Sequence, residues 1–261
     1  MSGRHSKGSR GVPWTPWDAQ VLVRSAGAAA ATLLLAWLVT AATDEGGVPW
    51  GERLGRTLPL SPLCAALGVS AALAPVRWRG EAVALAALGR SRAQIAAAAV
   101  AGGALVALAA ALFIGFVHRV DVTGFYPTAA HAAAFRWTGA AFIDPVHGLQ
   151  VGADGMPARV PVEAGASLAS LPAYARAAAA LTTALAGVAL PLLLAHGLLS
   201  RSPERRLRRA DAWMAACGVA SVSASVVLFQ SAAAHQLPAV AAALPALALL
   251  ALAVQRYRVA P

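Results

Sequence analysis

Long apolar stretches alternate with short polar segments along most of the chain. A helix of about 20 apolar residues is long enough to cross the hydrocarbon layer of a membrane. Stretches of about that length cover residues 21–42, 58–76, 95–117, 174–199 and 212–234, and a sixth follows Pro238 and ends near Val254. This pattern predicts an all-α membrane protein with six transmembrane helices.

Two of the intervening segments are more than simple turns. Residues 80–94 predict a short helix between the second and third spans. Residues 118–172 predict a small extramembrane insertion, in which GLQVGADGMPARVPV alternates around Asp154-Gly155 as a β-hairpin does. The expected organisation is a tail (1–20), three spans with the short helix (21–117), the insertion (118–172), three further spans (173–256) and a second tail (257–261).

Composition agrees with a lipid environment. Of the 261 residues, 59% are apolar and 12% are charged, whereas soluble domains carry about 25% charged residues. The formal charge of +10 does not indicate nucleic-acid binding, because the arginines cluster beside apolar runs rather than on one polar face. Cys64 and Cys217 fall inside apolar stretches, which favours a role as small core residues over a disulfide or a metal site.

The distribution of cations predicts the orientation. The two tails, the 77–94 segment and the 200–211 loop carry Arg4, Lys7, Arg10, Arg24, Arg77, Arg79, Arg90, Arg92, Arg201, Arg205, Arg206, Arg208, Arg209, Arg256 and Arg258. The opposite side carries Arg53, Arg56, Arg119, Arg136, Arg159 and Arg176. Cytoplasmic loops are rich in Lys and Arg, so both termini are expected in the cytoplasm and residues 118–172 outside it.

No catalytic constellation is apparent in the sequence. The spans hold no paired aspartates, no HExxH and no Ser/His pairing, so neither an intramembrane enzyme nor a catalytic residue is predicted. His118, His131 and His147 are spaced irregularly, which favours a solvated loop over a metal site. The sequence has no GxxxxGK[ST], so we expect no directly bound nucleotide and no other bound cofactor.

The segment GEAVALAALGRSRAQI, from Gly80 to Ile95, carries the most information about function. Its alanines, valine and leucines give a short helix an apolar side, Gly89 interrupts it, and Arg90 and Arg92 add charge. The residues alone leave three interpretations open. The segment is a helix that docks into a groove of another protein, an amphipathic helix at the membrane surface, or the beginning of the third span.

This segment resembles the coupling region of the LptF/LptG (YjgP/YjgQ)-type permeases, the transmembrane subunits of the lipopolysaccharide-export ABC transporter. Glu81, Ala84, Leu85 and Gly89 match the E-x-x-A-L-x-x-x-G pattern between the second and third helices of that family. Leu58-Pro59-Leu60 is similar to the entry of its second helix, and Leu181–Arg201 to its fourth helix. The resemblance extends over about 200 residues, in the same order of six spans.

The resemblance implies a permease subunit in a bacterial inner membrane that pairs with a second permease subunit. A cytoplasmic ABC ATPase dimer would hold ATP and Mg, and the substrate would be lipopolysaccharide or a related lipid. The residues expected to contact the ATPase are Glu81, Ala84, Leu85, Leu88, Gly89, Arg90 and Arg92. Arg53, Arg56 and Arg176, near the outer interface, would contact lipid headgroups or act as ordinary interfacial anchors.

The chain departs from the family between the third and fourth spans. The family carries a large periplasmic β-jellyroll there, whereas this chain has about 55 residues, so it resembles a compact member without that domain. Two alternatives therefore stand beside lipopolysaccharide transport. One is a membrane scaffold or assembly subunit that does not transport, and the other is a permease for another lipid or a lipoprotein, with residues 118–172 binding a periplasmic partner.

Overall fold

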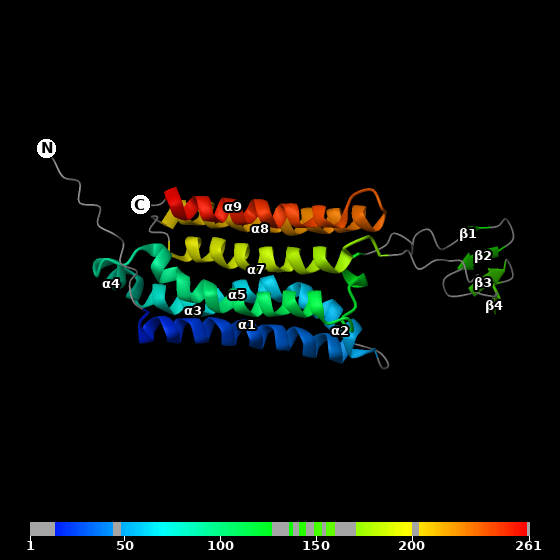
Figure 1. Cartoon of the computed structure of the whole chain (residues 1–261), viewed down its shortest axis with the longest axis horizontal. Helices are drawn as coiled ribbons and strands as arrows, with labels where there is room; N and C mark the ends of the chain where they lie inside the picture. Colours follow the sequence, from blue (N-terminus) through cyan, green and yellow to red (C-terminus); the bar gives the residue numbers. More distant parts are fainter. Residues whose placement is uncertain are drawn as a thin grey trace.

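The computed structural model describes residues 14–43, 48–126, 136–137, 141–144, 149–152, 155–159, 171–199 and 204–259. Its six apolar helical spans run over Pro16–Thr43, Trp50–Trp78, Arg92–Phe116, Ala175–Leu199, Ala215–Ala233 and Ala239–Tyr257. Each is long and apolar enough to cross a membrane, which confirms the predicted helical, multi-pass fold. The described ends of the chain lie at one end of the bundle (Figure 1).

The first part of the chain forms, in order, α1 (Pro16–Thr43), α2 (Trp50–Thr57), the 3-10 turn η1 (Leu58–Leu60), α3 (Ser61–Trp78), α4 (Glu81–Ala87) and α5 (Arg92–Phe116). The first three spans are formed by α1, by α2 with η1 and α3, and by α5, and the short helix α4 lies between the second and third spans. We refer to the end of the bundle that carries α4 as the α4 end, and to the opposite end as the α2 end (Figure 1).

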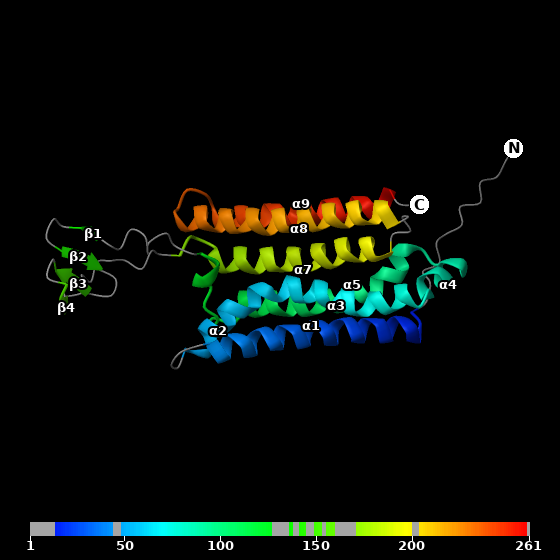
Figure 2. The same cartoon turned by 180° about the vertical axis from the view of Figure 1, so that it is seen from behind.

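The second half of the chain begins with 3-10 turn η2 (Thr123–Phe125) and a small sheet, and supplies the remaining helices. These are α7 (Ala175–Leu199), α8 (Glu204–Ala233), the 3-10 turn η3 (Ala239–Ala243) and α9 (Leu244–Val259). In the view from behind, α3 and α5 lie between α1 and α7, and α8 and α9 lie on the far side of α7 (Figure 2).

Small residues let the inner helices approach closely. A side chain at Gly68 of α3 would meet the carbonyl of Ser25 on α1, and one at Gly102 of α5 would meet the carbonyl of Leu22. The Ser25 hydroxyl donates to the carbonyl of Ala99, at 2.7 Å. Helices in lipid pack through such small residues because no hydrophobic effect drives them together. The Ala- and Gly-rich composition therefore produces a dense core of α1, α3, α5 and α7.

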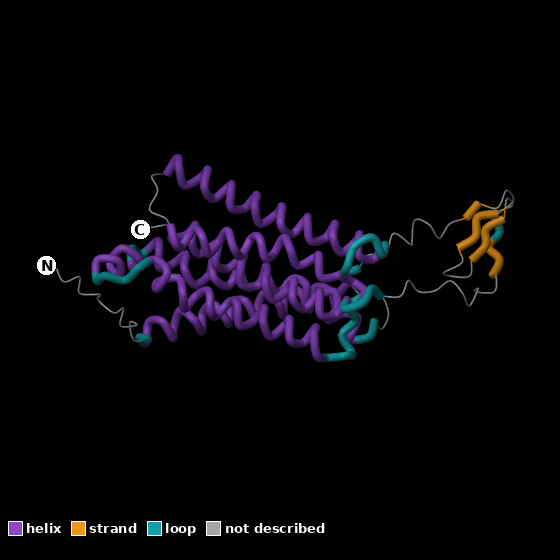
Figure 3. Tube along the Cα trace, turned by 45° about the horizontal axis from the view of Figure 1, so that its top comes forward, coloured by secondary structure: helices purple, strands orange, loops and turns teal. Residues whose placement is uncertain are grey.

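Helix α8 is packed differently from this core. Its main contacts are with η3 and α9, and in Figure 3 it stands apart from the bundle toward the α4 end. Only 22% of the apolar stretch of α8 is buried in the bundle, compared with 50% of the apolar stretch of α5. The separation leaves an apolar groove of about 640 Å³ between α3, α7 and α8, lined by residues such as Leu63, Leu194 and Val219.

Four short strands form an antiparallel meander beyond the α2 end (Figure 1). They are β1 (Arg136–Trp137), β2 (Ala141–Asp144), β3 (Leu149–Gly152) and β4 (Pro157–Arg159). The predicted hairpin is confirmed, because β3 pairs with β4 and Gly155 in the turn has a φ of 74°. Strands β1 and β2 were not predicted, and they enlarge the hairpin into a four-stranded sheet.

Several predicted boundaries differ from the structure. The segment 48–57, expected as a loop, contains the helix α2, and the 200–211 loop is helical from Glu204 onward. The short helix expected over 80–94 is confined to Glu81–Ala87, because residues from Arg92 onward belong to α5. Helices α1 and α9 extend into the predicted tails.

Candidate functional site

Two glycines isolate α4 between the second and third spans. Gly80 has a φ of 72° and Gly89 a φ of 85°, conformations that residues with a Cβ rarely adopt. After the turn at Gly89, Ser91 and Gln94 form a capping box at the start of α5. The Gln94 side chain accepts from the Ser91 N–H at 2.8 Å, and the Ser91 hydroxyl accepts from the Gln94 N–H at 3.3 Å. The sequence therefore ends one helix and begins another within four residues.

A buried ion pair fastens this junction to the start of α1. The Arg90 guanidinium donates to both carboxylate oxygens of Asp18, at 2.9 and 2.8 Å. The Arg90 side chain is 11% exposed and the Asp18 side chain 9%. Thr15 donates to the same carboxylate through its N–H and its hydroxyl, at 2.9 and 2.7 Å. The hydrogen bonds to Asp18 raise the pKa of Arg90 above its usual value.

Trp17 connects the same helix start to α4. Its ring centroid lies 5.7 Å from Cζ of Arg90, within cation–π range. Its Nε1–H donates to Oε2 of Glu81 at 3.4 Å, and Arg79 approaches the other oxygen of Glu81 at 3.8 Å. Both Glu81 and Arg90, the two charged residues that flank α4, thus contact the first turn of α1.

The predicted coupling residues divide into two groups. The first group is turned into the protein: Leu85 packs against the core cluster that includes Val21, Leu73 and Ile95, and Arg90 forms an ion pair with Asp18. Ala84, Leu88 and Gly89 are exposed, and Leu88 keeps 82% of its surface accessible. Val83 of α4 is also exposed, at 58%. Only part of the predicted surface therefore faces outward.

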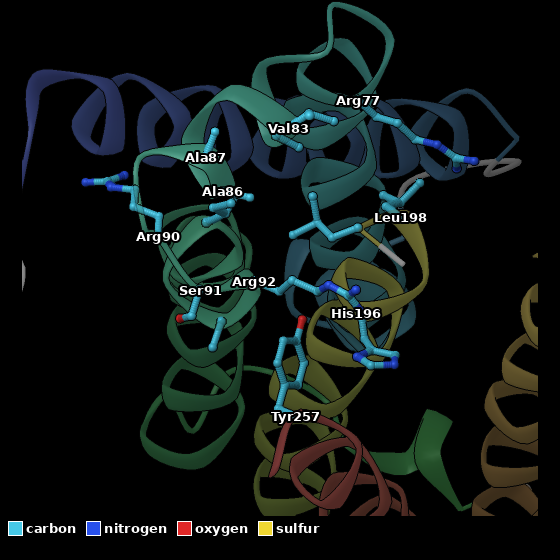
Figure 4. Close-up of a pocket in the computed structure, with 14 residues that line it drawn as sticks. Arg77, Val83, Ala86, Ala87, Arg90, Ser91, Arg92, His196, Leu198 and Tyr257 are labelled. Carbon is cyan, nitrogen blue, oxygen red and sulfur yellow. The ribbon is translucent and has the colours of Figure 1, made fainter. Parts of the chain in front are cut away.

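A cavity of about 760 Å³ opens at the α4 end, between α4 and the ends of α3, α5, α7 and α9. Figure 4 shows Arg92 extending from α5 toward His196 of α7 and Tyr257 of α9. The rings of His196 and Tyr257 meet edge to face with centroids 5.2 Å apart. The Tyr257 hydroxyl donates to the carbonyl of Leu192 at 3.2 Å. Arg92, predicted as a coupling residue, is thus part of the cavity wall.

The three arginines predicted to contact headgroups lie at the α2 end in different surroundings. Arg53 places its guanidinium 5.6 Å from the ring centroid of Trp37, and Arg56 pairs with Glu52 at 2.6 Å. Arg176 donates to the carbonyls of Ile114, Val117, His118 and Val120, at 2.8, 2.9, 3.2 and 2.8 Å. These bonds engage all the terminal N–H groups of Arg176, which caps the carboxyl end of α5.

Aromatic packing closes the α2 end beside Arg176. Phe229 of α8 meets the rings of Phe125 and Tyr126 edge to face, with centroids 5.6 and 5.1 Å apart. The Tyr126 hydroxyl donates to the carbonyl of Ala175 at 2.8 Å. Burial raises the pKa of Tyr126 to about 12. This end of the bundle is held together by contacts between its own side chains, with a pocket of about 290 Å³ beside Phe125 and Phe229.

The described residues contain no group of three or more His, Cys, Asp or Glu side chains arranged to hold a metal ion. His118 is exposed at the end of α5, while His131 and His147 lie outside the described residues. The expectation that the chain carries out no chemistry of its own therefore stays a prediction.

The residues that contact the α4 junction, which are Thr15, Trp17 and Asp18, were not predicted from the sequence. The available signal was an acidic residue on the side of the chain that is otherwise rich in arginine. A carboxylate at the edge of a span needs a partner, and Asp18 has Arg90 and Thr15.

No protein-family model matches the chain, and no curated protein matches it. The resemblance to the LptF/LptG-type permeases therefore rests on Glu81, Ala84, Leu85, Gly89 and the order of the spans.

Proposed function

We propose that this chain is a transmembrane permease subunit of a bacterial ABC transporter, located in the inner membrane with its α4 end in the cytoplasm. It moves or extracts lipopolysaccharide or a related lipid, and a separate ATPase subunit supplies the energy. The orientation is supported by the excess of Lys and Arg in the tails and in the segments that join the helices at the α4 end. The substrate class is supported by the family resemblance and by the apolar groove beside α8.

The proposal rests on the exposure of α4 at the end of the bundle. All seven of its residues keep some exposure, although the turns on both sides of it are fixed. Val83 and Leu88 offer apolar surface, and Glu81 offers a carboxylate. An exposed apolar helix face at the edge of a membrane domain is the kind of element that inserts into a groove of a partner. We assign Val83, Ala84, Leu88 and Glu81 to the contact with the ATPase.

The Asp18–Arg90 pair gives this contact a mechanical consequence. Helix α4 follows α3 directly and is followed by α5, and the pair adds α1 to the same junction. A displacement of α4 when the ATPase dimer closes would therefore act on three spans together. Such rigid-body movement is a common way to transmit a change between subunits.

The substrate path is assigned to the apolar groove, and the second subunit to the spans that expose most of their surface. The groove between α3, α7 and α8 has apolar walls that suit acyl chains. Helices α1 and α8 are the least buried spans, because only 17% and 22% of their apolar stretches are buried. We therefore assign these two helices to the contact with a second permease subunit, which is either the same chain or a different one. We assign Arg53 and Arg56 of α2 to the lipid headgroups of the outer leaflet, because α2 lies at the end of the bundle opposite α4.

The small sheet favours a second candidate function. Four strands of two to four residues make a far smaller outer domain than a jellyroll. A scaffold or assembly subunit that has the helices of a permease but does not transport would need no larger domain. In that case α4 would still bind a partner, but the ATP-driven release of lipid would be missing.

Affinity purification of the full chain from its native membranes tests the proposal. We expect an ABC ATPase to co-purify with the unaltered chain, and Leu88→Arg and Glu81→Arg to lower its yield at least tenfold, as expected for an interface residue worth about 1.4 kcal/mol or more. Trp14→Arg is the matched control, because it places the same residue at another exposed apolar position near the α4 end.

The proposal fails if no ABC ATPase is recovered with the unaltered chain, or if Leu88→Arg, Glu81→Arg and Trp14→Arg retain equal amounts. Lipid export from reconstituted vesicles separates the two candidates. ATP-dependent loss of lipid supports the permease, whereas a stable complex with no lipid movement supports the scaffold.

A further inference from the structure

The cavity at the α4 end carries uncompensated positive charge. Its lining includes Arg77, Arg90 and Arg92, and no carboxylate among the residues that the structure describes. Asp18 neutralises Arg90. Within the described part of the chain, neither Arg77 nor Arg92 forms an ion pair. A cavity with two such guanidinium groups is electrostatically suited to an anion.

The arrangement around Arg92 suits the binding of a phosphate group. The Arg92 side chain of α5 approaches His196 of α7 across the cavity, beside the ring of Tyr257 (Figure 4), so side-chain donors from two helices converge. Arg92 and Ala93 also line the cavity as the first two residues of α5. The backbone N–H groups of a first helical turn have no intrahelical acceptor. A guanidinium fork beside a helix amino terminus is a common binding site for phosphate oxygens.

The remaining wall indicates that the ligand has an apolar part. Val83 and Ala86 of α4 and Leu198 and Leu199 of α7 line the same space. The volume of about 760 Å³ is that of a site for a sizeable organic ligand. The cavity also lies where the spans end, at the level expected for the lipid headgroups of that leaflet.

We propose that this cavity binds a phosphate-bearing amphiphile, with the phosphate held by Arg92 and His196 and with Arg77 at the rim. The phosphate comes from an anionic phospholipid of the leaflet at the α4 end or from a soluble phosphate compound. The occupied cavity braces α4 against α5 and α7. The phosphate contacts are separate from the proposed ATPase contact, because Arg92 lies on α5 and His196 on α7, and Val83 is the one residue assigned to the ATPase contact that also lines the cavity.

Binding is measured on the full chain in a neutral detergent by native mass spectrometry. The probes are short-chain phosphatidylglycerol, short-chain phosphatidylcholine and inorganic phosphate. Hydrogen exchange of residues 80–95 is followed with each probe. We expect one phosphatidylglycerol to bind per chain and to slow exchange over these residues, and phosphatidylcholine to bind more weakly because its headgroup has no net charge.

The variants assign the effect to the cavity. Arg92→Gln is expected to weaken phosphatidylglycerol binding about tenfold or more, the usual effect of losing charge-assisted hydrogen bonds. Ala86→Phe is expected to block binding while keeping both arginines, because it fills the cavity. Arg24→Gln is the control, since Arg24 is an exposed arginine of α1 that does not line the cavity.

Each outcome decides the proposal. Protection by phosphatidylglycerol alone identifies a lipid headgroup, and equal protection by inorganic phosphate identifies a soluble phosphate ligand. Equal binding by Arg92→Gln and Arg24→Gln, or unchanged binding by Ala86→Phe, overturns the site in favour of general charge attraction. If Arg92→Gln does not fold, Ala86→Phe and the rim variant Arg77→Gln decide between the same outcomes.

Discussion

The two ends of the helical bundle use arginine in opposite ways. At the α2 end, Arg176 uses its terminal N–H groups on carbonyls at the end of α5, beside a tight aromatic cluster. At the α4 end, Arg90 bonds a carboxylate from another helix, and Arg77 and Arg92 face a cavity. The α2 end thus satisfies its arginine with groups of its own chain, whereas the α4 end offers the cavity and the exposed helix face that we propose as binding sites. The following experiments test that contrast, beginning with the largest expected effect.

Removal of Arg176 is expected to destabilise the α2 end of the bundle. Arg176→Gln leaves four carbonyls at the edge of the membrane without their donor. We expect a loss of about 4 kcal/mol in unfolding free energy, since unsatisfied polar groups and lost charge-assisted bonds each cost about 1–3 kcal/mol. The melting temperature of the detergent-solubilised chain measures it. Arg119→Gln at a nearby exposed position should change little, and equal stability of the two variants would contradict the capping role.

Removal of Asp18 would leave the buried Arg90 without its counter-ion at the α4 end. Asp18→Asn leaves the Arg90 guanidinium, 11% exposed, without a counter-ion. We expect a loss of about 3 kcal/mol, as for other broken buried pairs. Combining Asp18→Asn with Arg90→Met should recover part of that loss in a double-mutant cycle. If the two substitutions are additive, the pair does not fasten α1 to the α4 junction.

Removal of the Tyr126 hydroxyl is expected to lower the stability of the α2 end by less than removal of Arg176. Tyr126→Phe loses one buried hydrogen bond to Ala175 and should cost about 1 kcal/mol. Burial raises the pKa of Tyr126 to about 12, from an unfolded value of about 10. The tyrosine's contribution is therefore complete below about pH 10 and is lost as pH rises toward 12. Melting curves across that range should fall more steeply for the unaltered chain than for Tyr126→Phe.

The smallest expected effect on stability is at Leu88. This side chain is 82% exposed, so Leu88→Arg should change the unfolding free energy by no more than about 0.5 kcal/mol. The same substitution is expected to remove the partner ATPase. Unchanged melting together with lost co-purification would sharpen the contrast between the two ends, and a large fall in melting temperature would show that Leu88 belongs to the fold.

The sequence predicted what depends on local pattern and little of what depends on contacts between distant segments. The six spans follow from runs of apolar residues, and the hairpin follows from alternation around Gly155. Helix α2 was missed because its eight residues include charged and glycine positions that resemble a loop. Strands β1 and β2 were missed because two to four residues give too short a pattern.

The candidate site was predicted in place but not in its contacts. Gly89 and the flanking charges located the α4 segment correctly between two spans. The pairing of Arg90 with Asp18 joins residues 72 positions apart, and no periodicity in the chain indicates it. Leu85 and Leu88 looked equivalent on the apolar side of a short helix, but only packing decides that the first is covered and the second exposed.

The Asp18–Arg90 pair also has a consequence for how the protein is made. Asp18 lies in α1, and its partner Arg90 follows 72 residues later in the chain, after α3. At a synthesis rate of about 5–20 residues per second, roughly 4–14 s pass before the guanidinium emerges. During that interval Asp18 lacks the guanidinium that it binds in the folded protein. The ion pair that joins α1 to the α4 junction therefore forms only after α3 and α4 have been synthesised.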